Sequence, residues 1–328
     1  MTGGSLLFFN ALHGWLSRHI FQFVLLSLIS GYFFPLQPTP SLKLLVMLLF
    51  SYMTFTTGLA TSFRDFVRIA KTPGIPLYTL GVIHIATPIV AWVAGHLFFP
   101  GQHLIQLGYL ISATIPVGVT SVIWTSIVRG NVALALVTVT MDTLIAPVLL
   151  PLFILLAAGI SIQIDYPRMI FDLLIMITGP SIAGMLLHDA TNGRIKAFAS
   201  GFGGVLSRLS FFGVIFLNST FVTPSIQWNS QILKILGVTS LVVAVGYILG
   251  YVAGRFIHAA PDIVLCIIYT TGMRNIATGL VIAMNYFTPE TALPIALAML
   301  FQQPFAALTA KIYHWRYPKE ESATEGMK

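Results

Sequence analysis

The sequence predicts an all-α, polytopic membrane protein with about ten transmembrane helices. Only 8% of its 328 residues are charged, 56% are hydrophobic, and the mean hydropathy is +0.88. Apolar runs of bilayer-spanning length follow one another from Phe21 to Tyr313 with short breaks between them. A water-exposed globular surface needs far more charge than this. We therefore expect one integral membrane domain whose main partner is the lipid bilayer.

Pro, Gly and charged residues bound the apolar windows and so place the elements. Residues 1–19 mix apolar side chains with His13, Arg18 and His19 and lack a cleavage site, so we expect a retained interfacial segment. Residues 314–328 are expected to form a cytoplasmic tail. The expected spans are 20–36, 42–62, 74–98, 104–127, 131–158, 169–188, 205–223, 232–257, 262–286 and 290–313.

Basic residues are distributed unequally between the two sides of the expected spans. If the N-terminus is cytoplasmic, 13 of the 17 Lys and Arg residues lie inside, and only Lys43, Arg168 and Lys234 lie outside. Short loops rich in Lys and Arg resist translocation, so both termini are expected in the cytoplasm of a cell (plasma or inner) membrane. This topology explains the net charge of +7 better than nucleic-acid binding does. The single Cys266 excludes disulfide frameworks and cysteine-based metal motifs.

The loop from Ile160 to Arg168 divides the spans into two sets of five, residues 20–158 and 169–313. An odd number of spans in each half forces the halves into opposite orientations. Inverted repeats of this kind are typical of secondary transporters.

Two spans contain a polar, glycine-centred break at similar depth. The fourth carries Ile-Pro-Val-Gly-Val-Thr-Ser at 115–121, and the ninth carries Tyr-Thr-Thr-Gly-Met-Arg-Asn at 269–275. Gly118 and Gly272 relax the backbone and Pro116 removes a donor, so unpaired backbone groups result. Such backbone is tolerated in a membrane where it lines a cavity. One break alone is equally an ordinary kink, but two at corresponding positions favour a binding site.

Asp142 and Arg274 are the charged residues deepest within the expected spans. One interpretation is a static ion pair that locks the fifth and ninth spans together. The other is that at least one of them contacts cargo. Arg274 begins the second half of a broken helix, where free amides and the helix dipole favour an anion such as a carboxylate. Asp142 is a candidate carrier of a coupling proton.

Other polar residues within the spans have two readings each. His84, beside Thr87 and Pro88, joins a proton route or is hydrogen-bonded packing. Gln302 and Gln303 are pocket groups or interhelical hydrogen-bond partners. The expected substrate-binding residues are Thr120, Ser121, Thr271, Gly272, Arg274, Asn275, Gln302 and Gln303.

Seven short segments can be compared with known membrane proteins: Met53 to Leu59, Phe63 to Phe66, Lys71 to Pro73, Pro116 to Val122, Arg129 to Leu134, Thr140 to Pro147 and Gly272 to Asn275. Together they resemble the bile acid/sodium symporter family, over essentially the whole chain from about Phe21 to Arg316. The resemblance implies ten helices in a panel and a core subdomain, with the fourth and ninth helices crossing near their breaks beside a cargo cavity.

The sequence departs from this family at its sodium sites. The family uses a glutamate and a glutamine in the ninth helix, where this chain has Thr270 and Arg274. Its asparagine after the fourth-helix serine is Val122 here, and a small hydroxyl residue of the fifth helix is Asp142. The residues that still match are Ser121, Thr143 and Asn275. The candidate ion-coupling residues are Asp142, Thr143, Ser121, Thr270 and His84, with sodium ligation open at Ser121, Asp142 and Thr143.

A sodium ion needs several oxygen ligands and is repelled by a nearby guanidinium. We therefore expect Arg274 and Asp142 to replace a bound ion and its ligand, giving proton-coupled or uncoupled transport of a small organic anion by alternating access. The alternative is sodium symport with a relocated ion site. No cofactor is expected beyond a sodium ion or a proton. No hydrolase, metalloprotease or P-loop motif indicates an enzyme, and two isolated charges do not make a channel lining.

Overall fold

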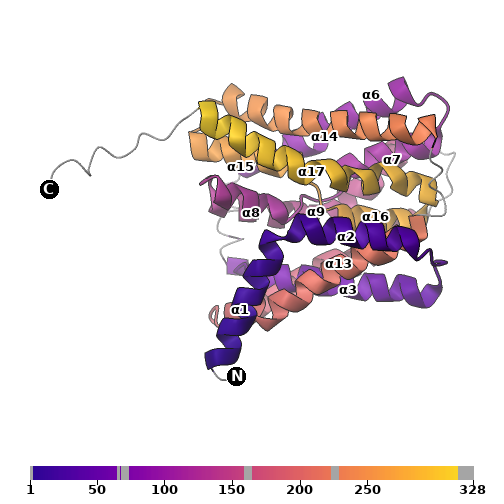
Figure 1. Ribbon diagram of the computed structural model, residues 1–328. Coiled ribbons are helices and arrows are strands. Elements are labelled where there is room, and N and C mark those ends of the chain that lie inside the picture. The colour runs from indigo at the N-terminus through magenta and orange to yellow at the C-terminus, as the bar shows by residue number, and fades with distance from the viewer. Residues whose placement is uncertain (1–2, 65–66, 68–73, 159–164, 223–228, 317–328) are drawn as a thin grey trace.

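A computed structural model describes residues 3–64, 67, 74–158, 165–222 and 229–316. These residues are helical apart from short connections, and the one β-type pairing among them is an isolated bridge between Val117 and Arg274. The predicted all-α class is confirmed. Most helices run alongside one another, and α1 (Gly3–Arg18) and the C-terminal end of the last helix lie at the same end of the bundle (Figure 1).

The helices of the first half follow the expected spans closely, because Pro, Gly and polar residues end them. They are α2 (Ile20–Phe33), α3 (Pro40–Gly58), α5 (Gly74–Gly81), the π-helical turn η1 (Val82–Ala86), α6 (Thr87–Phe98), α7 (His103–Thr114), α8 (Thr120–Ile127) and α9 (Val132–Ala158).

The second half contains two interruptions of its own, a π-helical turn and the break of the ninth span. Its helices are α10 (Tyr166–Leu173), η3 (Leu174–Thr178), α11 (Gly179–Ala190), α12 (Lys196–Ser200), α13 (Phe202–Val222), α14 (Ser230–Phe256), α15 (Pro261–Gly272), α16 (Ile276–Tyr286) and α17 (Pro289–Arg316).

Seven helical stretches of the described chain are long and apolar enough to cross a membrane. Three shorter apolar helices are Gln22–Phe33, Pro261–Gly272 and Ile276–Tyr286, and the last two are the halves of the broken ninth span. The fourth span is likewise divided into α7 and α8, so both predicted breaks are present. The inverted relation of the two halves and the domain limits stay predictions, and most of the dividing loop and the tail lie outside the described residues.

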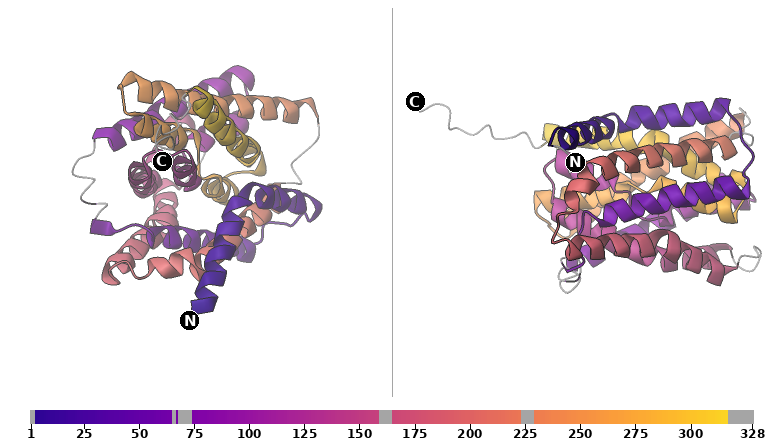
Figure 2. Two further views of the ribbon diagram at one scale, coloured as in Figure 1. Left: turned by 60° about the vertical axis from the view of Figure 1, so that its left-hand side comes forward. Right: turned by 90° about the horizontal axis from the view of Figure 1, so that it is seen from below.

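Two groups of helices pack internally. In the first, which we call the α3 group, α3 contacts α11 and α13, and α2 contacts α13. Gly58 and Gly184 bring α3 and α11 close, since a Cβ at Gly58 would lie 2.3 Å from the Ser181 carbonyl oxygen. In the second, the α15 group, α15 packs on α14 and α8, while α17 packs on α7, α14 and α16. The views in Figure 2 show these helices end-on and from below.

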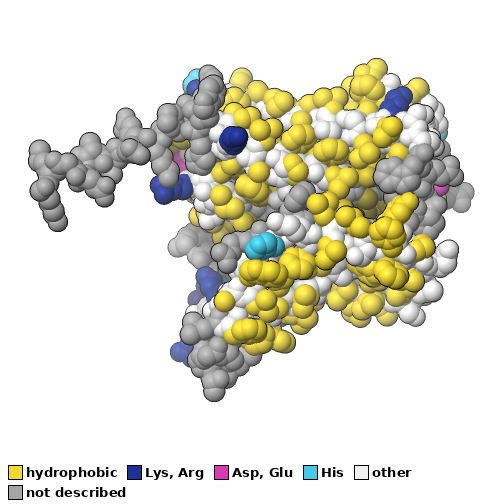
Figure 3. All heavy atoms as spheres, viewed as in Figure 1, with side chains coloured by type: hydrophobic (Ala, Val, Ile, Leu, Met, Phe, Trp, Pro, Cys, Tyr) yellow, Lys and Arg dark blue, Asp and Glu magenta, His cyan; other side chains and the backbone are white. Residues whose placement is uncertain are grey.

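The surface is apolar over the middle of the bundle. Figure 3 shows hydrophobic side chains covering the visible face, with Lys and Arg side chains gathered toward the ends. Large apolar side chains such as Leu156, Leu97 and Phe256 are 72%, 68% and 76% exposed. Exposed apolar surface of this extent fits contact with lipid, so the chain is a multi-pass membrane protein.

Candidate functional site

The two helix breaks cross and are joined by backbone hydrogen bonds. The N–H of Gly118 donates to the Met273 carbonyl at 3.1 Å, and the N–H of Asn275 donates to the Pro116 carbonyl at 2.7 Å. The Gly118 backbone lies so close that a Cβ there would be 2.9 Å from the Arg274 carbonyl oxygen. The crossing thus satisfies backbone groups that the breaks release, and it requires glycine at position 118.

Asp142 of α9 lies next to the break of the fourth span. Its carboxylate accepts a hydrogen bond from the Val117 N–H and contacts the His84 ring at Nε2. Both side chains are buried, and the His84 ring stacks on Phe153 at 6.3 Å. The second ring nitrogen of His84, Nδ1, has no hydrogen-bond partner. Asp142 and His84 therefore form a buried acid–base pair.

A π-helical turn in the third span leaves a backbone carbonyl group available to accept a hydrogen bond from Arg274. The Thr87 N–H bonds to the Val82 carbonyl five residues back. In the same register the next donor would be residue 88, but Pro88 has no N–H, so the Ile83 carbonyl has no backbone partner there. Arg274 Nη2 donates to that carbonyl at 3.1 Å and to Thr87 Oγ1 at 2.5 Å. Thr87 Oγ1 in turn donates to the Ile83 carbonyl at 2.5 Å.

The interpretation of Asp142 and Arg274 as a direct ion pair is wrong for the described chain. The carboxylate of Asp142 contacts His84, whereas the guanidinium of Arg274 bonds to residues of the third span. The two charges still belong to one network, because Val117 bonds to Asp142 and pairs with Arg274 through the isolated bridge. Nη1 of Arg274 is buried without a hydrogen-bond partner.

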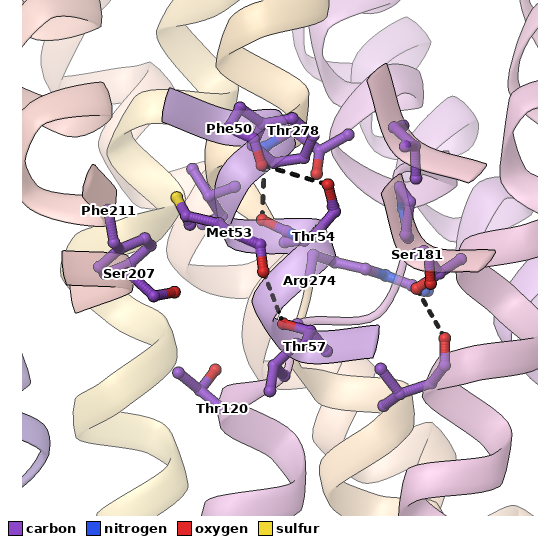
Figure 4. A pocket seen from close by; sticks show the side chains of 18 of the residues that line it. Phe50, Met53, Thr54, Thr57, Thr120, Ser181, Ser207, Phe211, Arg274 and Thr278 are labelled. Carbon is purple, nitrogen blue, oxygen red and sulfur yellow. Dashed lines mark hydrogen bonds between the residues drawn. The ribbon is translucent and has the colours of Figure 1, made fainter. Parts of the chain in front are cut away.

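A cavity with an empty volume of about 1160 Å³ lies between the crossing and the α3 group. Its walls come from the start of α2, the second and third turns of α13, the last turns of α3 and both break segments, together with residues of α9, α11 and α17. Figure 4 shows labelled side chains of α3, α11 and α13 converging on this cavity with Arg274 and Thr120. Among its described lining residues the charged ones are Arg208 and Arg274, and none is acidic.

A second cavity, with an empty volume of about 500 Å³, lies among α6, α7, α14, α15 and α17. Arg274, Ile276 and Gln302 line both cavities, so the ninth-span break separates them. Gln302 holds this break in place, since its Oε1 accepts the Arg274 backbone N–H at 2.7 Å.

The structure distributes the predicted residues over three places. Thr271 and Gly272 line the second cavity. Ser121, Asp142, His84 and Thr270 do not line either of these two cavities. Those that line the first cavity are Thr120, Thr143, Arg274, Asn275, Gln302 and Gln303.

Several predicted residues also make specific bonds. Ser121 Oγ is fully buried without a partner. Thr270 donates to its own helix at the Cys266 carbonyl, 2.8 Å away, and Thr143 donates to the Val139 carbonyl at 2.7 Å. Asn275 caps α16 by accepting the Thr278 N–H. Gln303 accepts the Trp124 indole N–H at 2.8 Å, so it joins α17 to α8 as well as lining the cavity.

Sequence reasoning missed the contribution of the α3 group to the cavity. Arg208 was counted with the cytoplasmic basic residues, yet it lies within α13 and lines the cavity with Ser207. Ser181 of α11 lines it too. The available signal was an arginine inside an expected span, 205–223. The described residues contain no group of three or more His, Cys, Asp and Glu side chains that could hold a metal ion.

Crossed, broken membrane helices beside a cavity that is lined by a buried arginine are typical of a membrane transport protein. The model of the Sodium Bile acid symporter family matches residues 46–234, more than half of the chain. The chain belongs to this family, whose members are transporters of small molecules and not enzymes.

Relatives from bacteria and plants agree with this assignment. "Uncharacterized protein YbaS" of Bacillus subtilis (strain 168) is 33% identical over 261 residues, 79% of this chain and 85% of the relative. "Uncharacterized sodium-dependent transporter YocS" of the same organism is 24% identical and covers 83% of each chain. "Probable sodium/metabolite cotransporter BASS2, chloroplastic" of Oryza sativa subsp. japonica is 25% identical, over 76% of this chain and 59% of the relative.

Proposed function

We propose that this protein is a secondary active transporter of a small organic anion that works by alternating access and is coupled to protons. The single observation that carries this proposal is the guanidinium of Arg274, which lies at the wall of a cavity whose described lining contains no acidic residue.

The guanidinium of Arg274 has no carboxylate of the described residues in direct contact. Asp142 attracts it from a distance, but its hydrogen bonds go to a carbonyl and a hydroxyl, which carry no net charge. Burying a charge without a contacting counter-ion is costly in a membrane protein. Thr278 Oγ1 lines the same cavity and is buried without a partner. A carboxylate in the cavity neutralises Arg274 and accepts from this hydroxyl, so anion binding relieves two unsatisfied groups.

The Asp142–His84 pair supports proton coupling. A histidine is the side chain that titrates nearest to neutral pH, and here it contacts a buried carboxylate. Ile83, which accepts from Arg274, is the residue directly before His84. A proton that enters the pair changes the charge next to the segment that holds Arg274, and this links proton binding to anion binding.

Arg274 also supports a mechanism without a bound sodium ion at this position. Its guanidinium donates hydrogen bonds to the Ile83 carbonyl and the Thr87 hydroxyl. These are oxygen groups of the kind that a sodium ion requires as ligands. A fixed positive charge repels a second cation at short range. We therefore propose that Arg274 acts as a tethered substitute for the coupling ion.

Sodium coupling through a relocated site is the second candidate. Ser121 Oγ is buried with no partner, and two relatives carry names that describe sodium-dependent transport. The two mechanisms are separated by the imposed ion gradient that drives uptake.

We further propose that the protein lies in the cell membrane with both termini in the cytoplasm, as the distribution of Lys and Arg indicates. In that orientation the cavity extends from the helix breaks toward the cytoplasmic side, because its lining also includes Ile20, Gly58 and Thr61 near the end of the bundle that carries α1.

Uptake of labelled organic anions into liposomes containing the purified protein tests the transport assignment. Saturable uptake that Arg274→Gln abolishes and Arg255→Gln leaves unchanged is the expected result, since Arg255 is an exposed arginine of α14. Equal uptake by all three proteins, or none by the wild type over a broad panel of carboxylates and sulfonates, contradicts the proposal.

A further inference from the structure

We propose that Arg208 is a second anion-binding residue and that the cargo is an organic dianion with an apolar body, held by Arg274 at one negative group and by Arg208 at the other. This inference rests on the proposed function and specifies its substrate class.

Arg208 lines the same cavity as Arg274 from the other group of helices. It belongs to α13 of the α3 group, whereas Arg274 lies in the break between α15 and α16. Its Nε donates to Ser17 Oγ at 3.1 Å, and its terminal nitrogens make no hydrogen bond to another described residue. The ion pairs among the described residues do not include Arg208. The fork of the guanidinium is thus free to bind a carboxylate in two-point geometry.

Among the described residues, the titratable group that interacts with Arg208 is His13, which supplies no negative charge. His13 of α1 packs near α13, where a Cβ at Gly204 would lie 2.9 Å from its ring. Burial and the charge of Arg208 lower the pKa of His13 below its ordinary value of 6.5, so the ring is neutral at neutral pH. The described cavity wall therefore carries two guanidinium groups, and neither forms a direct ion pair with a carboxylate of the described residues.

The wall of the cavity also carries large apolar side chains from both helix groups. Phe50 and Met53 of α3, Ile177 of η3, Phe211 of α13 and Met299 of α17 line it. Charged ends with an apolar body match this lining, because apolar contact removes surface from water while the arginines bind the ends. A monoanion leaves one arginine without a counter-ion, so the site discriminates by an unpaired charge.

Simultaneous binding of one cargo molecule to both arginines affects the arrangement of the two helix groups. A cargo that binds Arg274 and Arg208 together links the α15 group to the α3 group, so it favours the arrangement in which both arginines reach one cavity. A monoanion bound at Arg274 does not make this link.

Binding of adipate and sebacate, each compared with its monomethyl ester, tests the inference on the purified full-length protein by isothermal titration or thermal stabilisation. The ester keeps the length and one carboxylate but removes the second charge. We expect the wild type to bind at least one diacid about tenfold or more tightly than its ester, as a lost charge-assisted contact implies. Arg208→Gln should remove this preference while retaining ester affinity, and Arg208→Lys should keep part of it.

A control variant separates Arg208 from arginines in general. Arg255→Gln removes an exposed arginine of α14 and should keep the wild-type preference. A diacid preference that survives in Arg208→Gln, or equal affinity of the wild type for diacid and ester, overturns the inference.

The same measurements distinguish failure of the dianion inference from failure of the proposed transport function. If esters bind and Arg274→Gln weakens them but no diacid preference exists, the dianion inference fails and the anion transporter stands. If no anion of either kind binds the wild type and Arg274→Gln changes nothing, both fail.

Discussion

The carboxylate of Asp142 accepts a hydrogen bond from the backbone N–H of Val117, an amide that the break between α7 and α8 releases from its helix. The same carboxylate contacts His84. Asp142 thus combines a structural task at the helix crossing with a titratable contact, and different substitutions should separate the two.

Asp142→Ala removes both contacts and leaves the Val117 amide and His84 unsatisfied in a buried position. We expect it to lower the free energy of unfolding by about 1–3 kcal/mol and to abolish transport. Asp142→Asn keeps an acceptor for the amide but cannot take up a proton. It should fold with a near-wild-type melting temperature in detergent yet lose proton-driven accumulation. A proton-driven Asp142→Asn protein contradicts the coupling role.

His84→Gln tests the other member of the pair. Glutamine can still donate a hydrogen bond to Asp142 but does not titrate near neutral pH. We expect counterflow exchange of the anion to continue, while accumulation no longer responds to an imposed pH gradient. If accumulation by His84→Gln follows the pH gradient as it does in the wild type, His84 is only a packing residue.

Pro88→Ala restores an N–H one residue after Thr87, where it competes with Arg274 for the Ile83 carbonyl. Anion affinity should fall several-fold without a loss of melting temperature, because a helix interior tolerates alanine better than proline. Pro180→Ala is the matched control. Pro180 follows the turn η3 in the same way, after the Gly179 N–H bonds to the Leu174 carbonyl, and it does not line the cavity. Equal effects of the two substitutions contradict the role given to the Ile83 carbonyl.

Gly118→Ala places a Cβ 2.9 Å from the Arg274 carbonyl oxygen, and backbone atoms cannot move aside cheaply. We expect a loss of about 1–3 kcal/mol in stability and a strong loss of transport, as the crossing separates. Gly237→Ala in α14 meets no atom within 4 Å and should be neutral or stabilising. Melting temperatures and uptake rates of the two variants, measured side by side, check this contrast.

Much of the fold could be predicted from the sequence because lipid imposes strong rules. Apolar windows ending at Pro, Gly and charge located the helices within a few residues, and glycine-centred polar segments located both breaks. Helix α3, expected at 42–62, ends at Gly58. The π-helical turns were not predicted, since the i+5 pairing leaves the apolar pattern of a span unchanged.

The site was predicted only in part. Asp142 and Arg274 were identified because buried charges are rare, but their partners depend on which residues of the third span face them. A single sequence does not show how the third span is rotated about its axis, so a direct pair of Asp142 and Arg274 was one open interpretation. In the structure, the partner of Asp142 is His84. Arg208 and Ser181 were missed since their place on the cavity wall depends on how α13 and α11 pack against the crossing.

Accumulation of a labelled organic anion in proteoliposomes under an imposed proton gradient, an imposed sodium gradient, or neither tests the central claim most directly. The account predicts that a proton gradient drives accumulation in the wild type, that sodium adds nothing, and that Asp142→Asn and Arg274→Gln both abolish the response. Accumulation that a sodium gradient drives at constant pH would contradict it, and would assign the coupling ion to a site other than the one that Arg274 occupies.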